Sequence, residues 1–323
     1  MRIGLTYNLK PEGASRSAGD RYEEFDSIET IEALESSLRN CGHDPVRLGW
    51  GPPMLDKLSQ NGIDAVFNLA EGIGGRGRES QVPATLEMLG IRCTGSDAVA
   101  IGITLDKGLA KLMAKAYGIA TAPWMVVSGS PRPSAAFTAE GGGAPLRYPL
   151  FVKPSCEGSS MGVTSKSLCN NEAELHEAVG RVSQYGPVLV EEFLPGNEYT
   201  VGILGGKVIG VMQVVPKTTS DDHWFYSIEV KRDYVRQVDY RIVDEPRVAA
   251  VALEIWNAFG LRDVARIDVR CDRDGVPNFV EVNPLPGVHP VNSDLVILAK
   301  GVGWTYDQLI AGIMQSAEER WAA

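Results

Sequence analysis

The sequence predicts an α/β protein in three parts: an N-terminal parallel α/β domain over residues 1–103, a small subdomain over 104–197 and a C-terminal antiparallel-sheet subdomain over 198–323. Strand and helix patterns alternate in the first part, which is typical of a parallel sheet. A stretch rich in Gly, Pro, Ser and Ala at residues 128–147 predicts a loop that links subdomains. In the last part, paired apolar runs separated by turn residues predict antiparallel hairpins.

The N-terminal part begins with an apolar strand from Arg2 to Tyr7. The stretch "SIETIEALESSLR" predicts a helix, with Ser27 as its N-terminal cap and Gly42 just beyond its end. A second strand, "IDAVFNLAEG", ends in Glu71 and the loop "GIGGRGRES". Ligands of parallel α/β sheets bind at the carboxyl ends of strands, so Glu71 lies where a ligand would be expected.

The middle part predicts a helix over residues 104–117, "TLDKGLAKLMAKAY", that buries one apolar face. The side chains expected to point inward are Leu105, Leu109, Leu112, Met113 and Ala116. Strands follow at "APWMVVS", "PLFVK" and "PVLVEEFL", with a helix at "NEAELHEAVGRVS" before the last of them.

The C-terminal part opens with "EYTVGILGGKVIGVMQVV", which predicts a hairpin that turns at Gly205 and Gly206. The polar segment over residues 216–240 has only weak periodicity. A helix at "PRVAAVALEIWNAFG", a second hairpin at "VARIDVRCDRDGVPNFVEVN" and a closing helix from Thr305 complete the predicted elements.

Composition narrows the classes of function. The net charge is −10, with no basic stripe, which argues against nucleic acid as a partner. No apolar run approaches the length of about 18 residues that spans a bilayer. The N-terminus has no signal-peptide core, and five scattered cysteines without a C-x-x-C pair suggest reduced thiols. We expect a cytoplasmic protein without a zinc site, because its four histidines are also scattered.

The second C-terminal hairpin carries the strongest chemical pattern. Alternate residues of a strand share a face, so Arg266 lies beside Asp268, and Glu281 lies beside Asn283 on the partner strand. The turn "DRDG" brings Asp268 roughly opposite Glu281. Facing carboxylates repel unless a cation lies between them, which suits Mg²⁺ held together with substrate phosphates. A solvated surface ion pair is the alternative, and the rigid "NPLPGVHP" turn that follows favours the metal site.

Two further stretches suggest a nucleotide. In "FVKPSCEGSSMGVTS", Lys153 ends an apolar strand and a glycine–serine loop follows, as in a phosphate clamp or a flexible surface hairpin. The stretch "VEEFLPGNEYTV" carries Glu191, Glu192 and Glu198 around Phe193 and Leu194. It could pair with a purine edge and bind ribose hydroxyls, or form an acidic surface loop.

Taken together, these stretches resemble the ATP-grasp superfamily and, within it, the D-alanine–D-alanine ligases. The resemblance runs from about Ala65 to Gly287 through "TLDKGLAK", "FVKPSCEGSSMGV", "VLVEEFLPGNEYTV", "FYSIEVK", "ARIDV" and "FVEVNPLPG". It implies an ATP-grasp fold with residues 104–197 as a lid. It also implies an ADP-forming ligase that makes an amide through an acyl phosphate. The substrates would be two D-alanines, or other amino acids or peptides. A nucleotide-binding module without turnover is the alternative from another class.

The resemblance also assigns roles to residues. ATP phosphates would be held by Lys107, Lys153, and the lid-loop residues Ser159 and Ser160. The purine would be bound by Glu191, Phe193 and Leu194, the ribose by Glu198, and the transferred phosphate by Lys231. Magnesium, or manganese, would be bound by Asp268, Glu281 and Asn283. The oxyanion would be stabilised by Arg266 and the Gly287 N–H, so the catalytic group would comprise Arg266, Ser159, Lys231 and Gly287.

The resemblance is weaker where the amino acids would bind. Glu71 stands where a histidine is usual in the ligases, and Arg232 stands where a tyrosine is common. Ser293 and Asp294 fall near the position of a serine–leucine pair that holds the second substrate's carboxylate. The N-terminal glutamate motif has no clean match, with Glu23, Glu24, Asp26 and Glu29 as candidates. A homodimer is expected by analogy with similar ligases, and Cys156 in the lid loop is expected to be a bystander.

Overall fold

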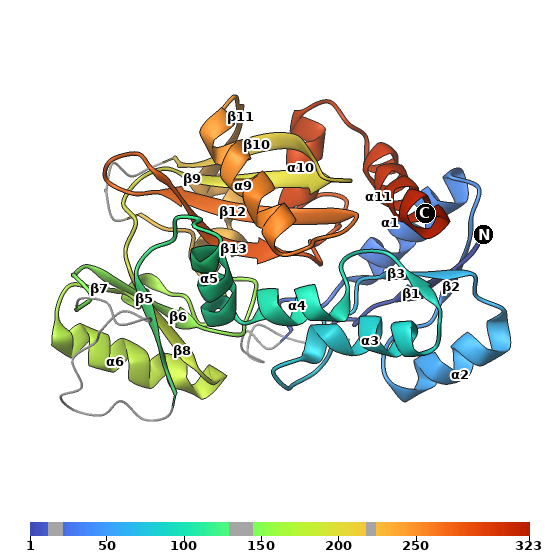
Figure 1. Cartoon of the computed structure of the whole chain (residues 1–323), viewed down its shortest axis with the longest axis horizontal. Helices are drawn as coiled ribbons and strands as arrows, with labels where there is room; N and C mark the ends of the chain where they lie inside the picture. The colour runs from blue at the N-terminus through green and yellow to red at the C-terminus, as the bar shows by residue number, and fades with distance from the viewer. Residues whose placement is uncertain (12–21, 129–144, 218–223) are drawn as a thin grey trace.

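The computed structural model describes residues 1–11, 22–128, 145–217 and 224–323, which form three sheets with helices packed against them (Figure 1). Most of the predicted linker at 128–147 and part of the polar segment at 216–240 lie outside the described residues. The two termini lie at the same end of the molecule, beside α1 and α11 (Figure 1). Among the described helices, none is both long and apolar enough to cross a bilayer.

The first sheet is parallel, as the alternating pattern predicted. Its strand order is β2-β1-β3-β4, with β1 at Arg2–Thr6, β2 at Asp44–Arg47, β3 at Ala65–Asn68 and β4 at Arg92–Cys93. The helices of this part are α1 (Ile28–Asn40), α2 (Pro52–Asn61), α3 (Gln81–Met88) and α4 (Ala98–Leu105). The Ser27 side chain accepts a hydrogen bond from the Thr30 N–H, which confirms the predicted cap of α1.

One face of the parallel sheet is covered by the last helix of the chain, α11 (Tyr306–Ala322). Ile3 and Leu5 of β1 share a buried cluster with Ile310 and Ile313 of α11. Helix α11 starts after Thr305, as predicted, and Thr305 forms a capping box with Gln308. The beginning and the end of the sequence therefore build one core.

Asp263 links the same two ends of the chain through polar contacts. Its buried carboxylate lies 2.7 Å from the Arg320 guanidinium of α11 and accepts a hydrogen bond from the Gly95 N–H, just after β4. A carboxylate in this position needs both partners, because an unpaired buried charge is costly.

The second sheet belongs to the predicted lid. It is antiparallel, with strand order β5-β8-β6-β7: β5 at Trp124–Val127, β6 at Leu150–Pro154, β7 at Leu168–Cys169 and β8 at Val188–Glu192. Helix α6 (Glu172–Val182) begins at its cap Asn171 and buries Leu175, Ala178 and Val179 against this sheet.

The third sheet is also antiparallel, with strand order β11-β10-β9-β12-β13. Its strands are β9 (Glu198–Leu204), β10 (Lys207–Pro216), β11 (Val238–Val243), β12 (Val264–Cys271) and β13 (Pro277–Asn283). The turn at Gly205 and Gly206 is confirmed, and both glycines have positive φ, which favours glycine. Helix α9 (Pro246–Ala258) covers one face, and α10 (Asp294–Gly301) lies on the other.

The predicted helix over 104–117 is wrong in its start and in part of its buried face: Leu105 is buried and Met113 packs against a core cluster, but Leu109, Leu112 and Ala116 are exposed. Asp106 ends α4 with an extended ψ of 99° and caps a new helix, α5 (Lys107–Ala116), by accepting hydrogen bonds from two backbone N–H groups. Leu109 and Leu112 are 37% and 43% exposed, whereas Lys111 is only 1% exposed. The buried side carries small residues, and a Cβ at Gly108 would come within 2.7 Å of Val126. Helix α5 therefore buries the small residues that let it approach the lid sheet closely, and not all of the large apolar residues that its pattern predicted to be buried.

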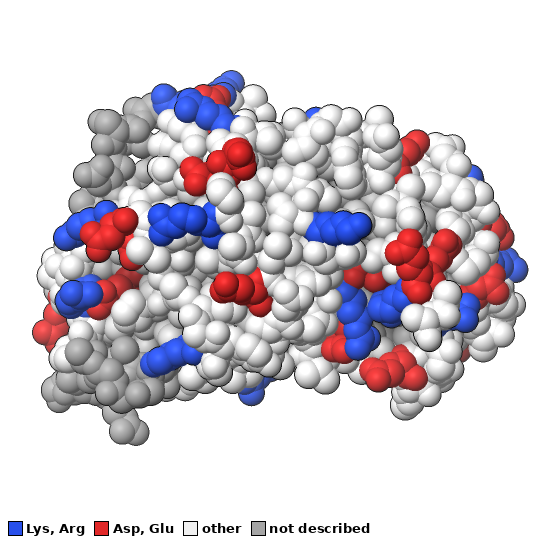
Figure 2. Space-filling model, turned by 45° about the horizontal axis from the view of Figure 1, so that its top comes forward, with Lys and Arg blue, Asp and Glu red and all other residues white. Residues whose placement is uncertain are grey.

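The polar segment after β10 contains two short helices, α7 (Ile228–Arg232) and α8 (Tyr234–Gln237). The five cysteines are all unpaired in the structure. On the face shown in Figure 2, acidic and basic side chains are interspersed and form no continuous basic stripe over the described residues. The domain boundaries at 103/104 and 197/198 stay predictions.

Candidate active site

The candidate site is a pair of adjoining cavities between the lid sheet and the third sheet. A cavity of about 140 Å³ is lined by residues of the lid strands, the loop after β6, β12 and β13. A second cavity, of about 430 Å³, extends toward the parallel sheet. Both are lined by Lys107, Ser159, Lys231, Arg266 and Glu281, so these residues stand where the two spaces meet.

The predicted metal residues do meet on one face of the hairpin. In the β12–β13 ladder Asp268 pairs with Glu281 and Arg266 pairs with Asn283, next to a bulge after Asp268. The Asn283 amide donates to Asp268 over 3.3 Å, and Thr200 of β9 donates to the other Asp268 oxygen over 2.8 Å. Facing carboxylates with an amide beside them are a hard-oxygen donor set, and this set fits Mg²⁺.

The two carboxylates differ in their surroundings. Burial raises the pKa of Asp268 to about 6. Burial works in the same direction on Glu281, but Lys107, Lys153 and Arg266 hold the pKa of that carboxyl at about 2. The Lys107 Nζ lies 3.4 Å from Glu281 and donates to the backbone carbonyl of Glu157 over 2.6 Å. Glu281 is therefore ionised and ready to bind a cation at neutral pH.

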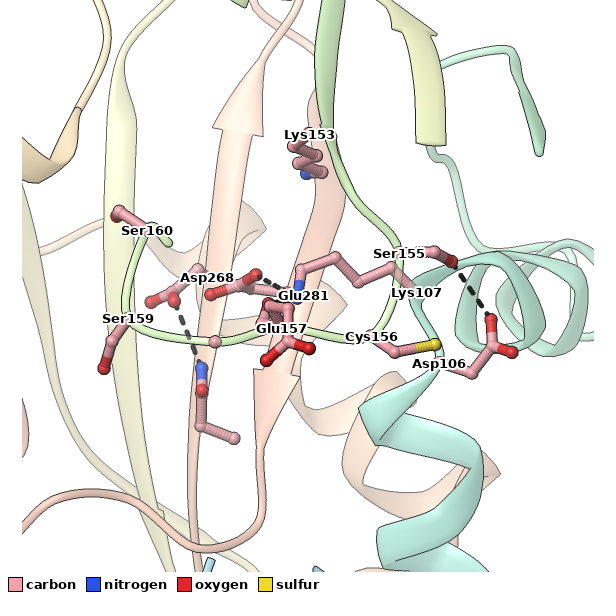
Figure 3. Close-up of polar contacts among 12 residues, drawn as sticks. Asp106, Lys107, Lys153, Ser155, Cys156, Glu157, Ser159, Ser160, Asp268 and Glu281 are labelled. Carbon is pink, nitrogen blue, oxygen red and sulfur yellow. Dashed lines mark hydrogen bonds and ion pairs between the residues drawn. The ribbon is translucent and has the colours of Figure 1, made fainter. Parts of the chain in front are cut away.

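The loop after β6 passes over these groups, as Figure 3 shows for the segment from Ser155 to Ser160. Ser159 and Ser160 have φ angles of 51° and 55°, in the left-handed region that non-glycine residues seldom adopt. The Ser159 hydroxyl lies 3.2 Å from the Lys231 Nζ, which comes from α7 on the opposite wall. Strained backbone of this kind is often found at ligand clamps.

The two carboxylates predicted to face the nucleotide are each paired with buried cations. One Glu191 oxygen lies 2.7 Å from the Lys153 Nζ, and the other lies 2.6 Å from the Lys111 Nζ. The Glu198 carboxylate accepts a hydrogen bond from Arg270 over 2.8 Å. Lys111 and Arg270 are functional candidates that the sequence analysis missed.

The Arg270 guanidinium also stacks on Phe193, 4.8 Å from the ring centroid, and Phe193 lines the smaller cavity with Leu194. A sequence signal for Arg270 did exist, because it continues the alternation of Arg266 and Asp268 along one face of the strand. Lys111 also had a signal, since it follows Lys107 by one helical turn.

The larger cavity has an acidic wall near the parallel sheet. Glu24, Glu71 and Glu79 place carboxylate oxygens within 4.8 Å of one another. Arg78 lies 2.8 Å from Glu24 and also donates to the Cys156 carbonyl in the lid loop over 2.7 Å. Burial raises the pKa of Glu79 to about 7, and burial raises that of Glu71 well above its ordinary value.

Glu24 and Glu23 connect this acidic wall to the loop after β6 and to α7. Glu24 accepts a hydrogen bond from the Gly158 N–H over 2.7 Å, and Glu23 forms an ion pair with Arg232 of α7. Among the four N-terminal acids predicted as candidates, Glu23, Glu24 and Asp26 line the larger cavity. Glu29 instead lies 3.4 Å from His289.

The residues predicted at the second-substrate end gather around Arg266. Asp294, the first residue of α10, lies 3.1 Å from the Arg266 guanidinium, and Tyr240 donates to the same carboxylate over 3.3 Å. The Ser293 hydroxyl accepts a hydrogen bond from the His289 N–H, and Gly287 lines the cavity beside them. A Cβ at Gly287 would come within 2.9 Å of the Ser293 hydroxyl, so the turn tolerates only glycine without rearrangement.

Three sheets in this arrangement, with lysines and paired carboxylates facing one cavity between two of them, define a carboxylate–amine ligase of the ATP-grasp superfamily. The family described as D-ala D-ala ligase C-terminus matches residues 113–315. The D-alanine–D-alanine ligase of Actinobacillus pleuropneumoniae is 33% identical over 292 residues, covering 90% of this chain and 92% of the relative. The chain belongs to the D-alanine–D-alanine ligase family and is an ADP-forming, ATP-dependent ligase.

Further relatives include an uncharacterised protein, y4sG, of Sinorhizobium fredii, which is 29% identical over 99% of this chain and 98% of its own length. The fold is similar to that of D-alanine–D-alanine ligase from Bacillus anthracis complexed with ATP, with a TM-score of 0.74 and 23% identity over 99% and 98% of the two chains. It is also similar to the VanG D-Ala:D-Ser ligase from Enterococcus faecalis, with a TM-score of 0.72 and 20% identity over 98% and 99%. Family membership favours an enzyme over the alternative of a nucleotide-binding module without turnover.

Proposed function

We propose that this ligase uses ATP to activate the carboxylate of one amino acid or peptide and joins it to the amine of another. The observation that carries the proposal is the meeting of Arg266, Asp268 and Glu281 with Lys107 and Lys231 around one cavity. These residue types match the needs of phosphoryl transfer, which requires positioned cations and metal-binding carboxylates rather than a protein nucleophile.

The nucleotide would occupy the smaller cavity. Its base would lie against Phe193 and Leu194 near Glu191, and its ribose near Glu198. Lys107, Lys153 and the N–H and hydroxyl groups around Ser159 and Ser160 would hold the phosphates. Asp268, Glu281 and Asn283 would hold magnesium, which when bound would neutralise the charge of the transferred phosphate. These roles are supported by the placement of the residues around the two adjoining cavities.

The reaction would run in two steps. The substrate carboxylate attacks the γ-phosphorus of ATP, ADP leaves, and an acyl phosphate forms close to Lys231. The amine of the second substrate then attacks the acyl carbon, and the phosphate leaves as the amide forms. Arg266 and the Gly287 N–H would stabilise the oxyanion between these events. A closed loop over Ser159 would exclude water, which would otherwise hydrolyse the acyl phosphate.

The first candidate reaction is the joining of two D-alanines, which is supported by the similarity of the chain to D-alanine–D-alanine ligases. A second candidate, the joining of other amino acids or peptides, is favoured by specific residues at the substrate end. Asp294 holds Arg266 where a carboxylate-bearing acceptor would approach, and Glu71 adds another acid to the wall of the larger cavity. Asp294 disfavours an acceptor whose own carboxylate would lie beside Arg266, as that of D-alanine is expected to do.

The test is ATP-dependent phosphate release with D- and L-amino acids, singly and in pairs, with the products identified by mass. A D-alanyl-D-alanine product from D-alanine alone supports the first candidate. Release only with another pair supports the second. No release with any pair contradicts the proposal.

We also propose a cytoplasmic location, which the five unpaired cysteines support. The homodimer stays a prediction.

A further inference from the structure

Lys111 is one of the two most deeply buried charged side chains in the ion pairs of the described residues, with its side chain 1% exposed like that of Asp263. It lies on α5, one turn after Lys107, and it does not line either cavity of the site. Burying an ammonium group is costly unless charged and polar partners surround it. The identity of those partners therefore indicates what this lysine does.

Lys111 joins three parts of the fold. Its Nζ lies 2.6 Å from Glu191 on the lid strand β8, and it donates to the Thr121 hydroxyl over 2.7 Å. That hydroxyl donates to the backbone carbonyl of Phe279 on β13, two residues before Glu281. The Nζ also stands 5.7 Å from the Trp124 ring centroid of β5. Figure 1 shows α5 between the lid sheet and the third sheet, where these contacts converge.

The link to the nucleotide runs through Glu191. This carboxylate uses one oxygen for Lys111 and the other for Lys153, and only Glu191 and Lys153 face the cavity. The two lysines hold the pKa of Glu191 at about 2 although burial acts to raise it, so Glu191 remains ionised. The triad carries one net positive charge on the wall of the nucleotide cavity.

We propose that Lys111 is a positioning residue of the nucleotide site. From its place outside the cavity it neutralises the charge of Glu191, so that the charge of Lys153 is available to the phosphates of ATP. Without Lys111, Glu191 would pair with Lys153 alone, and the net charge of the group would fall from +1 to zero. The inference rests on the proposed nucleotide site, and it assigns a role to a residue that never touches the nucleotide.

The experiment is calorimetric titration of the full chain with ATP and Mg²⁺, without amino acids. Lys111→Met, which keeps the length of the side chain, is expected to weaken ATP binding about tenfold, because a unit charge near a phosphate site has been lost. The double variant K111M/E191Q restores the net charge of +1. Because Glu191 is itself assigned to the purine, this variant is compared with E191Q alone, and we expect the Lys111→Met change to weaken ATP binding much less in that background than in the unaltered chain. Lys115→Met is the matched control, since Lys115 lies one turn further, also stands over Trp124, and is exposed.

The outcomes separate the inference from the function on which it rests. If the unaltered chain does not bind ATP, the proposed function is overturned together with the inference. If the chain binds ATP and K111M binds equally well, only the inference is overturned. If K111M weakens ATP binding as much in the E191Q background as in the unaltered chain, Lys111 has a structural role and the inference is also overturned. Thermal unfolding accompanies each titration, and Lys111→Gln, which can still bond Thr121, replaces the Met variant if that variant does not fold.

Discussion

The Asp294 carboxylate lies 3.1 Å from the Arg266 guanidinium, at the point where the two cavities of the site adjoin. Arg266 also lies 2.9 Å from Asp268 and 3.8 Å from Glu281, so three carboxylates share one guanidinium that is expected to stabilise an oxyanion. An anionic acceptor approaching Arg266 would have to compete with Asp294 for the same N–H groups.

Replacing Asp294 by Ser is therefore expected to improve the use of acceptors that carry a carboxylate. We expect the ratio of KM for D-alaninamide to KM for D-alanine, as second substrates, to rise about tenfold as one repulsive charge is removed. Steady-state phosphate release with each acceptor measures this ratio. An unchanged ratio would place Asp294 outside the acceptor site.

Replacing Glu281 by Ala is expected to abolish turnover. Glu281 stands opposite Asp268 in the ladder and 3.4 Å from Lys107, so its loss removes a metal ligand and the partner of a phosphate-binding lysine. We expect kcat to fall about a hundredfold or more. Glu254→Ala, on the exposed side of α9, is the control. Near-normal turnover in a folded E281A chain would exclude the metal assignment.

Arg270 is expected to set the ribose contact through Glu198. Arg270→Met removes the partner that lies 2.8 Å from the Glu198 carboxylate, and the pKa of Glu198, already raised by burial, should rise further. We expect ATP to bind about tenfold more weakly. We also expect the preference for ATP over 2′,3′-dideoxy-ATP to disappear. Titration with both nucleotides measures this, with the exposed Arg241→Met as control. If the variant still prefers ATP to 2′,3′-dideoxy-ATP, Glu198 contacts the ribose independently of Arg270.

Glu79 is expected to make the protein less stable as the pH rises. Burial raises the pKa of this carboxyl from 4.5 to about 7, so the folded state favours the neutral form. The cost of ionisation is absent below pH 4.5, grows as the pH rises toward 7 and is complete above pH 7. Glu79→Gln should therefore raise the melting temperature more at pH 8 than at pH 5. Equal gains at both pH values would mean that Glu79 titrates normally in the folded protein.

Several elements were predictable because local pattern and tertiary packing agree there. The β12–β13 hairpin is an example: alternation and a "DRDG" turn predict the hairpin, and the structure places Asp268 opposite Glu281 as expected. The turn alone sets the register only as far as Val269 and Phe279, and a bulge, which the pattern did not predict, then brings the two carboxylates together. The parallel sheet and the caps of α1 and α11 follow from similarly local signals.

Helix α5 shows why the rest was not predictable. Its apolar residues Leu109 and Leu112 face outward, and its buried side carries Lys111 and small residues. The reason lies in Glu191, which is distant in the sequence and compensates the buried lysine with its own charge. Periodicity predicts burial on the assumption that apolar residues are buried and charged residues are exposed, so it cannot detect a buried ion pair between Lys111 and Glu191. The polar segment that contains α7 was missed for a similar reason, because its contacts with the lid loop come from residues far away in sequence.

The cluster that joins Ile3 and Leu5 to Ile310 and Ile313 has a consequence for how the protein is made. Helix α1 joins this cluster soon after β1 is synthesised, through Ile31, Leu34 and Leu38, but α11 joins it only after the two antiparallel sheets have been synthesised. Domains commonly fold in the order of their synthesis. Here the core of the first sheet is finished only when α11 has been made, so we expect part of its apolar surface to stay exposed while the other two sheets are synthesised.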